Sequence, residues 1–237
     1  MSRFLLFLFL LVPYTFFAQN LILNPGFEQN RGCPEKPGQI NLANHWFSPN
    51  IGTPDYFHTC SPGLDYGTEF NKKGGRLPHS GMGYAGLQFY CMNRNEYYEY
   101  MENLLDTALA PGALYCIQVF VSLAKANYAF KELGAVASVN EIKTSSSKKM
   151  ILPYTPLKNG QYLDDQNGWI QICGFFKAKG NERFITLGDF QKGDEFWNID
   201  LRSTTDSVFK SSYYFIDDVL LVKINDSTEC KCNPGTR

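Results

Sequence analysis

Apolar and polar residues alternate along this chain in short runs, which is the pattern of half-buried β-strands. The clearest run covers residues 114–123, where Tyr115, Ile117, Val119 and Val121 fall on one face. Runs of the same kind predict further strands at residues 84–90, 97–105, 133–139, 168–178 and 183–187. Because long helical periods are scarce, the pattern predicts an all-β fold.

Two apolar runs near the ends of the chain, residues 20–28 and 213–222, carry acidic side chains. Each is typical of a strand, and together they predict a β-sandwich whose first and last strands lie side by side. Residues 29–83 form a long irregular stretch rich in Gly, Pro and Asn, and a loop of that length is usually functional or disordered. Its aromatic residues indicate that it packs, and they are Trp46, Phe47, Tyr56, Phe57 and Phe70.

The first residues have the features of a secretory signal peptide. Arg3 supplies a positive charge, and residues 4–12 are an unbroken apolar run too short to span a bilayer. Ala18 then precedes Gln19 as at a cleavage site. The alternative is an uncleaved anchor helix, but Pro13 interrupts the apolar run before it is long enough.

We therefore expect three parts in the chain: a signal peptide at residues 1–18, one β-sandwich domain at residues 19–224, and a tail at residues 225–237. No second segment is apolar enough to cross a membrane, so the mature chain is expected to lack a transmembrane segment. The expected location is the periplasm, the outer membrane surface or the outside of the cell.

Composition and charge narrow the class of partner. Acidic and basic residues are interspersed, and the formal net charge is −1. This balance gives no electrostatic reason to expect nucleic acid or an anionic membrane surface as the partner. With 19 Phe, 14 Tyr and 20 Gly, the composition favours twisted sheets joined by turns.

The chain has 7 cysteines, which in an exported protein favour disulfides, and the odd count leaves at least one free or paired between molecules. Cys33 and Cys60 lie in turn-rich polar segments, so they are the expected disulfide. Cys116 and Cys173 lie inside strand patterns, where they either bridge neighbouring strands or remain buried thiols.

Six short motifs occur in an order that resembles a known family. They are Asn24-Pro-Gly-Phe-Glu28, Trp46 to Phe57, His79 to Gly86, Tyr115 to Leu123, Ile185 to Phe190, and Tyr214-Phe-Ile-Asp-Asp-Val219. The chain resembles the galactose-binding-like jelly-roll domain of Bacteroidetes envelope proteins, which often stands in front of an OmpA-type domain. The resemblance implies a jelly-roll β-sandwich with long loops. No OmpA-type domain follows residue 222, so peptidoglycan anchoring is not implied.

The resemblance also implies a structural calcium ion between the first and last strands. Glu28 with Asp217 or Asp218 would supply carboxylate ligands, and the family pattern favours Asp217. Asp217 and Asp218 point to opposite faces of a regular strand, so both serve one site only if the strand has a bulge. The alternative is that one carboxylate caps a turn and the other is solvated. Cys230 and Cys232 are half of a zinc-knuckle pattern without a matching pair, so zinc is not expected.

Glycans are recognised by aromatic rings that lie against the apolar faces of pyranoses, with polar side chains at the hydroxyl groups. The candidate ligand-binding residues are Asp55, Tyr56, His79, Tyr84, Tyr98 and Trp197. Trp197 lies in a polar loop and is expected to be an exposed platform, whereas Trp46 and Trp169 have apolar neighbours and are expected in the core. Ligand contact is therefore expected from the loops at residues 55–98 and 189–197.

Catalysis has little support in the sequence. The three histidines, His45, His58 and His79, lack the spacing of metal ligands, and the common hydrolase motifs are absent. His79 and Ser80 are adjacent, but sequence neighbours rarely align as base and nucleophile. The sequence predicts an exported, non-catalytic module that binds a carbohydrate or another component of the cell envelope. The alternative is a structural or adhesive envelope protein that binds another protein.

Overall fold

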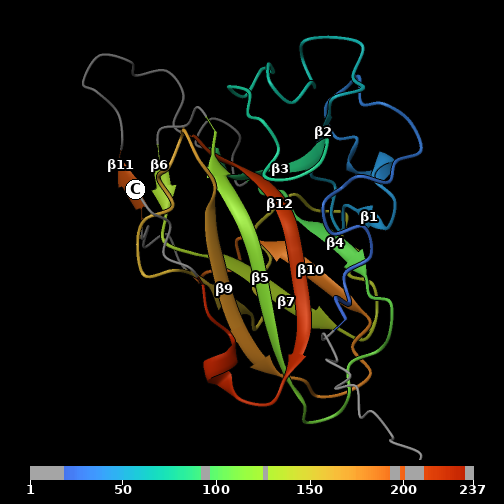
Figure 1. The fold of residues 1–237 in the computed structure, drawn as a ribbon, viewed down its shortest axis with the longest axis vertical. Coiled ribbons are helices and arrows are strands. Elements are labelled where there is room, and N and C mark those ends of the chain that lie inside the picture. Colours follow the sequence, from blue (N-terminus) through green and yellow to red (C-terminus); the bar gives the residue numbers. More distant parts are fainter. Residues whose placement is uncertain (1–18, 92–96, 125–127, 193–197, 201–210, 233–237) are drawn as a thin grey trace, which may run out of the picture.

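Two antiparallel β-sheets pack face to face, with β9, β5 and β12 in front of β7 and β10 in Figure 1. The computed structural model describes residues 19–91, 97–124, 128–192, 198–200 and 211–232. The first sheet has the order β1 (Trp46–Phe47), β4 (Met101–Leu104), β10 (Phe184–Gly188), β7 (Leu133–Ser138) and β8 (Thr155–Leu157). The second has the order β2 (Asp55–His58), β3 (Gly83–Cys91), β12 (Ser211–Ile224), β5 (Leu114–Leu123) and β9 (Ile170–Lys177).

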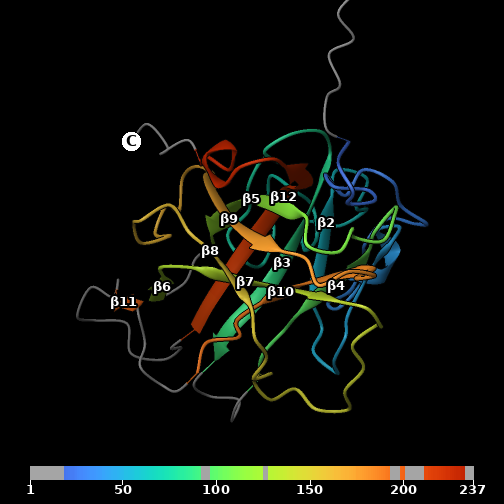
Figure 2. The same cartoon turned by 90° about the horizontal axis from the view of Figure 1, so that it is seen from below.

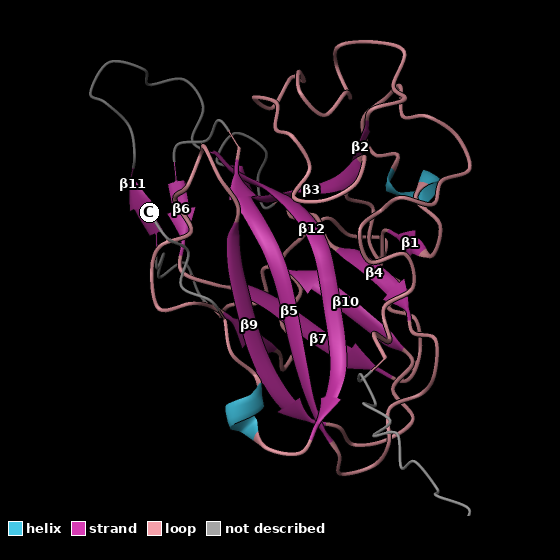
Figure 3. Cartoon of the chain, viewed as in Figure 1, coloured by secondary structure: helices cyan, strands magenta, loops and turns pink. Residues whose placement is uncertain are grey.

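The remaining elements are small. A two-stranded ribbon pairs β6 (Tyr128–Phe130) with β11 (Asn198–Asp200), and there are two 3-10 helices, η1 (Ile40–Leu42) and η2 (Ser227–Glu229). Figure 3 shows that strands and loops make up almost all of the described chain. None of the described helices has the length and apolar character needed to span a membrane.

Eight of the strands have the connectivity of a jelly roll. In chain order they are β3, β4, β5, β7, β8, β9, β10 and β12, and the chain changes sheet at every step except from β7 to β8. Four strands therefore lie in each sheet, in the orders β3-β12-β5-β9 and β4-β10-β7-β8, and Figure 2 shows the same sandwich from below. This arrangement confirms the predicted all-β jelly-roll sandwich. The long irregular stretch adds β2 and β1 at the sheet edges.

The alternation predicted for residues 114–123 is present in β5. Tyr115, Ile117, Val119 and Val121 are at most 3% exposed, and all four belong to the main hydrophobic cluster between the sheets. Burying an aliphatic side chain of this size stabilises a fold by roughly 1.5 to 3 kcal/mol. The period of two in the sequence therefore reports directly on which face of β5 packs against the opposite sheet.

The first and last segments lie side by side, as the sequence predicts, although the first is not a regular strand. β3 pairs with only the first part of β12, and the start of the chain runs along the remaining edge. The Leu21 N–H donates to the Leu221 carbonyl at 2.9 Å. The Asn20 side chain donates to the Val219 carbonyl at 3.0 Å and accepts from the Leu221 N–H at 2.9 Å. A side-chain amide thus takes the place of a strand's backbone groups.

A tight turn follows this first segment. Asn24 has a φ of 54°, which Asn adopts more readily than most residues, and its side chain donates to the carbonyls of Gln29 at 2.8 Å and Asn44 at 3.0 Å. Phe27 stacks on Trp46 with ring centroids 4.8 Å apart. Side-chain bonds and ring packing therefore hold the Asn24 to Glu28 motif in place.

Loops cover parts of both outer faces of the sandwich. On the second sheet, residues around Tyr66 pack over the outer face into a second cluster, whose members are Phe57, Tyr66, Tyr84, Ala124, Tyr213 and Phe215. On the first sheet, Ile142, Met150 and Leu152 pack against a third cluster. The aromatic-rich stretch therefore packs as predicted, except that Phe70 is 63% exposed.

Three disulfides cross-link the described chain. Cys33 and Cys60 form the predicted bridge. The two alternatives for the strand cysteines are both wrong, because Cys116 pairs with Cys230 and Cys173 pairs with Cys232. The segment expected to be a tail is thereby fixed across the outer face of β5 and β9, and its Lys231 carbonyl accepts from Gln118 at 3.2 Å. Sequence pattern missed this pairing because the partners lie far apart along the chain.

Candidate functional site

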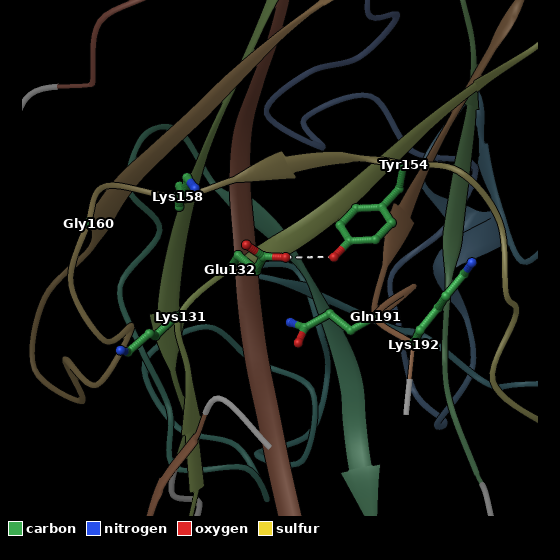
Figure 4. Close-up of a pocket in the computed structure, with 7 residues that line it drawn as sticks. All are labelled: Lys131, Glu132, Tyr154, Lys158, Gly160, Gln191 and Lys192. Carbon is green, nitrogen blue, oxygen red and sulfur yellow. Dashed lines mark hydrogen bonds between the residues drawn. The ribbon is translucent and has the colours of Figure 1, made fainter. Parts of the chain in front are cut away.

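A cavity of about 440 Å³ opens where three neighbouring strands of the first sheet end together (Figure 4). At the start of β7, Leu133 pairs with the last residue of β8. The next residue, Gly134, pairs with the last residue of β10. Residues just outside these strand ends are therefore brought together, and Tyr154 extends to them from the opposite end of the three-residue β8. The lining residues are Lys131, Glu132, Tyr154, Lys158, Gly160, Gln191 and Lys192.

A hydrogen bond between Tyr154 and Glu132 fixes the centre of this lining (Figure 4). The Tyr154 hydroxyl donates to Oε1 of Glu132 at 2.7 Å. Burial raises the pKa of Tyr154, and the hydrogen bond to Glu132 and the charges of Glu132 and Asp189 raise it further. The hydroxyl is therefore protonated at neutral pH and remains a donor.

The position of the Tyr154 ring depends on a glycine. The ring lies nearly parallel to that of Phe190, with centroids 6.1 Å apart. A Cβ at Gly134 would lie 2.6 Å from Cδ2 of Phe190 and 3.0 Å from Cδ2 of Tyr154. Real Cβ atoms essentially never approach a neighbour to 2.6 Å. Gly134 therefore allows both rings to lie against β7.

Basic side chains surround the Tyr154 and Glu132 pair. The Lys131 ammonium lies 4.7 Å from the ring centroid of Tyr162, within range of a cation–π contact. Lys158 and Lys192 are exposed. Glu132 supplies a carboxylate acceptor, and Gln191 supplies an amide that both donates and accepts. The lining therefore combines one aromatic ring with charged and amide groups in a concave site.

Four of the predicted ligand residues are buried, which corrects the expectation that they contact a ligand. Tyr56 and Tyr84 are fully buried, and Asp55 and Tyr98 are 4% and 7% exposed. Their polar groups also have partners in the protein: for example, Asp55 accepts from the Tyr213 hydroxyl at 2.6 Å. The physical reasons differ: Tyr56 belongs to the main cluster between the sheets, whereas Tyr84 and Tyr98 belong to the clusters that loops cover on the outer faces.

The other predicted aromatic positions differ in how far they are exposed. His79 has 32% of its side chain exposed, and its ring stacks on Phe120 with centroids 3.6 Å apart. Trp169, expected in the core, is only partly buried and donates from Nε1 to the Leu77 carbonyl at 3.0 Å. Trp197, the predicted platform, lies outside the described residues. Of the two predicted ligand loops, the one at residues 189–197 contributes Gln191 and Lys192 to the cavity.

The predicted metal ligands lie near one another: Asp217 and Asp218 belong to β12, and Glu28 lies beside them at Gly26. A register shift between Asp217 and Leu220 shows the bulge that both aspartates require to face one site. Asp218 accepts from the Ser80 hydroxyl at 2.9 Å and pairs with His79 Nδ1 at 2.6 Å. Asp217 accepts from the His79 N–H at 2.9 Å. Burial, and after it the charge of Asp218, raises the pKa of Asp217 to about 8.

Glu28 binds the backbone of the same loop that holds His79 and Ser80, but it does not complete a ligand shell. Its Oε1 accepts from the N–H groups of Met82 at 2.8 Å and Gly83 at 3.1 Å. Among the described residues, no group of three or more His, Cys, Asp or Glu side chains is placed to hold a metal ion. In this arrangement the carboxylates bind protein donors and do not fit a calcium shell. The calcium site stays a prediction, which elemental analysis and a melting curve in excess chelator would test.

Sequence reasoning missed the residues that line the cavity. Lys131 and Glu132 lie in the short connection before β7, and Tyr154 stands just before β8. Neither position belongs to a motif or to an alternating run. Their proximity follows from the register of β7 with β8, which joins residues more than twenty apart in sequence. The sequence signal that points to this site is a general one: polar residues in loops often carry function.

Comparisons with known proteins identify distant similarities of structure. No family model matches the sequence, and no curated protein matches it. The CBM22-1 xylan-binding domain of Xyn10C from Paenibacillus barcinonensis aligns over 89% of this chain and 98% of its own, with 10% identity and a TM-score of 0.45. A putative sugar-binding protein from Bacteroides thetaiotaomicron aligns over 87% of this chain and 100% of its own, with 12% identity and a TM-score of 0.42.

A third similar structure is an adhesin domain. The K1 cleaved adhesin domain of Lys-gingipain from Porphyromonas gingivalis aligns over 83% of this chain and 94% of its own, with 13% identity and a TM-score of 0.39. The jelly-roll assignment rests on the strand connectivity of this chain itself.

Proposed function

We propose that this protein is an exported, non-catalytic carbohydrate-binding module and that the cavity around Tyr154 binds the sugar. The observation that carries the proposal is the fixed pair of Tyr154 and Glu132 inside a cavity of about 440 Å³. Pockets for small ligands are typically roughly 300 to 1,000 Å³, and this cavity falls within that range. Sugar units have an apolar face for such a ring and hydroxyl groups for such acceptors.

The composition of the lining supports binding without hydrolysis. Most glycoside hydrolases place two carboxyl groups on either side of the scissile bond. Among the described residues that line the cavity, Glu132 is the sole carboxylate, and it already accepts a hydrogen bond from Tyr154. Such a site holds a saccharide but does not supply a second acid or nucleophile.

Export and association with the cell envelope are part of the same proposal. Three disulfides in one domain support an oxidising compartment, because such bonds are rare in reducing cytosol. The six motifs support a relationship to the galactose-binding-like domain of Bacteroidetes envelope proteins. Fusion of residues 1–18 to a reporter that lacks its own signal tests export. Retention of that reporter inside the cell would contradict it.

A glycan array probed with the full mature chain tests the binding function. We expect selective retention on one class of saccharide and loss of that signal in the Tyr154→Ala variant. Replacement of the exposed Leu64 by Ala provides the control, because Leu64 lies outside the cavity lining. An array on which the folded wild-type protein binds nothing would refute the proposal.

A second candidate function is adhesion to another envelope protein. Its support is a set of exposed apolar side chains on the loop before β3: Leu64 is 77% exposed, Leu77 65%, Phe70 63% and Met82 51%. Contiguous exposed apolar patches mark protein contact sites, and these four side chains all come from one loop. Capture of an envelope protein by the wild type but not by a Leu64→Ser, Phe70→Ser variant, together with a blank glycan array, would favour this function.

A further inference from the structure

The cavity around Tyr154 carries an excess of positive charge, and we infer that it selects acidic saccharides, whose units bear a carboxylate or a sulfate ester. This inference rests on the proposed glycan-binding function and specifies the class of sugar. Among the described lining residues, Lys131, Lys158 and Lys192 are basic and Glu132 alone is acidic. The whole chain has 22 basic and 23 acidic residues, so the excess is local to this cavity.

The carboxylate behind the lining does not cancel this charge. Asp189 is buried, and its charge helps to raise the pKa of the Tyr154 hydroxyl. It is already paired with the Lys149 ammonium, whose Nζ lies 2.8 Å from Oδ2 of Asp189. Among the described lining residues, the charges that an entering ligand meets are therefore those of the three lysines and of Glu132.

The arrangement of the lysines suits an anionic group on a sugar ring. In Figure 4, Lys131 and Lys158 lie on one side of the Tyr154 and Glu132 pair, and Lys192 lies on the other. A lysine ammonium is a compact charge with three freely rotating donors, so it accepts carboxylate and sulfate geometries alike. The lining therefore specifies an acidic saccharide as a class rather than one particular anion.

Variants of Glu132 and of the lysines should change the affinity for an acidic saccharide in opposite directions. Its charge repels an anionic ligand, while its oxygen atoms offer hydrogen bonds to sugar hydroxyls. Glu132→Gln removes the charge and keeps an oxygen that accepts from Tyr154. This variant should bind an acidic saccharide more tightly, whereas Lys158→Gln and Lys192→Gln should bind it more weakly.

Isothermal titration of the full mature chain tests the inference with three probes of equal length. These are an oligogalacturonate, a sulfated galacto-oligosaccharide and a neutral β-1,4-galacto-oligosaccharide. We expect tighter binding of at least one acidic probe than of the neutral one, with an affinity that falls as salt rises. Each Lys→Gln change should lower that affinity about two- to fivefold, and Glu132→Gln should raise it by a similar factor. Lys223→Gln, an exposed charge change on β12 outside the cavity lining, should leave it unchanged.

The outcomes separate this inference from the proposed function. Preference for the neutral probe, with Tyr154→Ala abolishing binding and the lysine variants unchanged, overturns the acidic selectivity and leaves the glycan-binding function intact. Absence of binding to all three probes, combined with a blank glycan array, overturns both. Equal binding of an oligodeoxythymidylate would show an unselective polyanion surface and would also overturn the inference. Response to only one acidic probe distinguishes the carboxylate from the sulfate.

Discussion

The hydroxyl of Tyr154 donates a hydrogen bond of 2.7 Å to Oε1 of Glu132, although the two residues belong to different strand connections. Glu132 precedes β7 and Tyr154 precedes β8, so they flank opposite ends of this antiparallel pair. The paired stretch is only Leu133 to Ala135, and the Tyr154 ring reaches Glu132 past Gly134, which has no side chain. The bond fixes a ring and a carboxylate in one wall of the cavity. A pair held in this way is pre-organised, so binding a ligand costs less ordering of side chains.

Gly134→Ala should displace the ring of Tyr154. The added Cβ would lie 2.6 Å from Phe190 and 3.0 Å from Tyr154, so both rings must shift. Overpacking of this kind typically destabilises a fold by about 1 to 3 kcal/mol. Urea denaturation measures the change, and saccharide binding should weaken as well. Gly63→Ala is the matched control, because nothing lies within 4 Å of a Cβ there. Equal stability of the two variants would contradict the packing described for Gly134.

Removal of the disulfide between Cys116 and Cys230 should destabilise the protein more than removal of that between Cys33 and Cys60. The first pair is separated by 114 residues and the second by 27. If restriction of the unfolded chain dominates, the losses are about 4 to 5 kcal/mol and about 3 to 4 kcal/mol respectively. Paired Cys→Ser variants compared by urea denaturation measure the difference. The opposite order would show that native contacts of the bridges outweigh chain entropy.

Stability should fall as pH rises from 4.5 to about 7. Burial, and after it the charge of Asp55, raises the pKa of Glu99 to about 7 from the ordinary value of 4.5. Because the folded state holds this proton more tightly, its contribution is fully present below the unfolded pKa and is lost as pH rises towards the folded pKa. Each unit of pKa difference corresponds to about 1.4 kcal/mol.

Melting temperatures between pH 4.5 and 7 measure this dependence. Glu99→Gln is the test variant, because Gln keeps an oxygen that can accept from the Gln88 N–H, a bond of 2.8 Å in the native protein. We expect a shallower dependence in this variant than in the wild type. Glu102, whose pKa burial also raises to about 7, leaves a residual slope. A variant with the same slope as the wild type would show that Glu99 does not titrate in this range.

Much of the architecture was predictable because strand alternation reports burial. The inward face of β5 was assigned correctly from Tyr115 to Val121, and the pairing of the end segments followed from their apolar patterns. The alternation does not show whether the outer face of a sheet is also covered. Tyr84 faces away from the main core but is buried in the second cluster, and for that reason it was wrongly expected to face a ligand.

The candidate site was harder to predict because register, not local pattern, assembles it. Lys131, Glu132 and Tyr154 lie in connections without a motif, and they meet only once β7 pairs with β8. The bridges from the strand cysteines to Cys230 and Cys232 were missed for the same reason. Contacts between residues far apart in sequence need the three-dimensional arrangement of the strands.

The most direct test of the binding function is the dissociation constant of the best saccharide from the array, measured by calorimetry for the wild type, Tyr154→Phe and Tyr154→Ala. Phe keeps the ring and removes only the hydroxyl that donates to Glu132. We expect Tyr154→Phe to weaken binding about three- to tenfold, as for loss of one hydrogen bond, and Tyr154→Ala to abolish it while the protein stays folded by circular dichroism. Unchanged affinity in a folded Tyr154→Ala variant would contradict the assignment of this cavity as the sugar site.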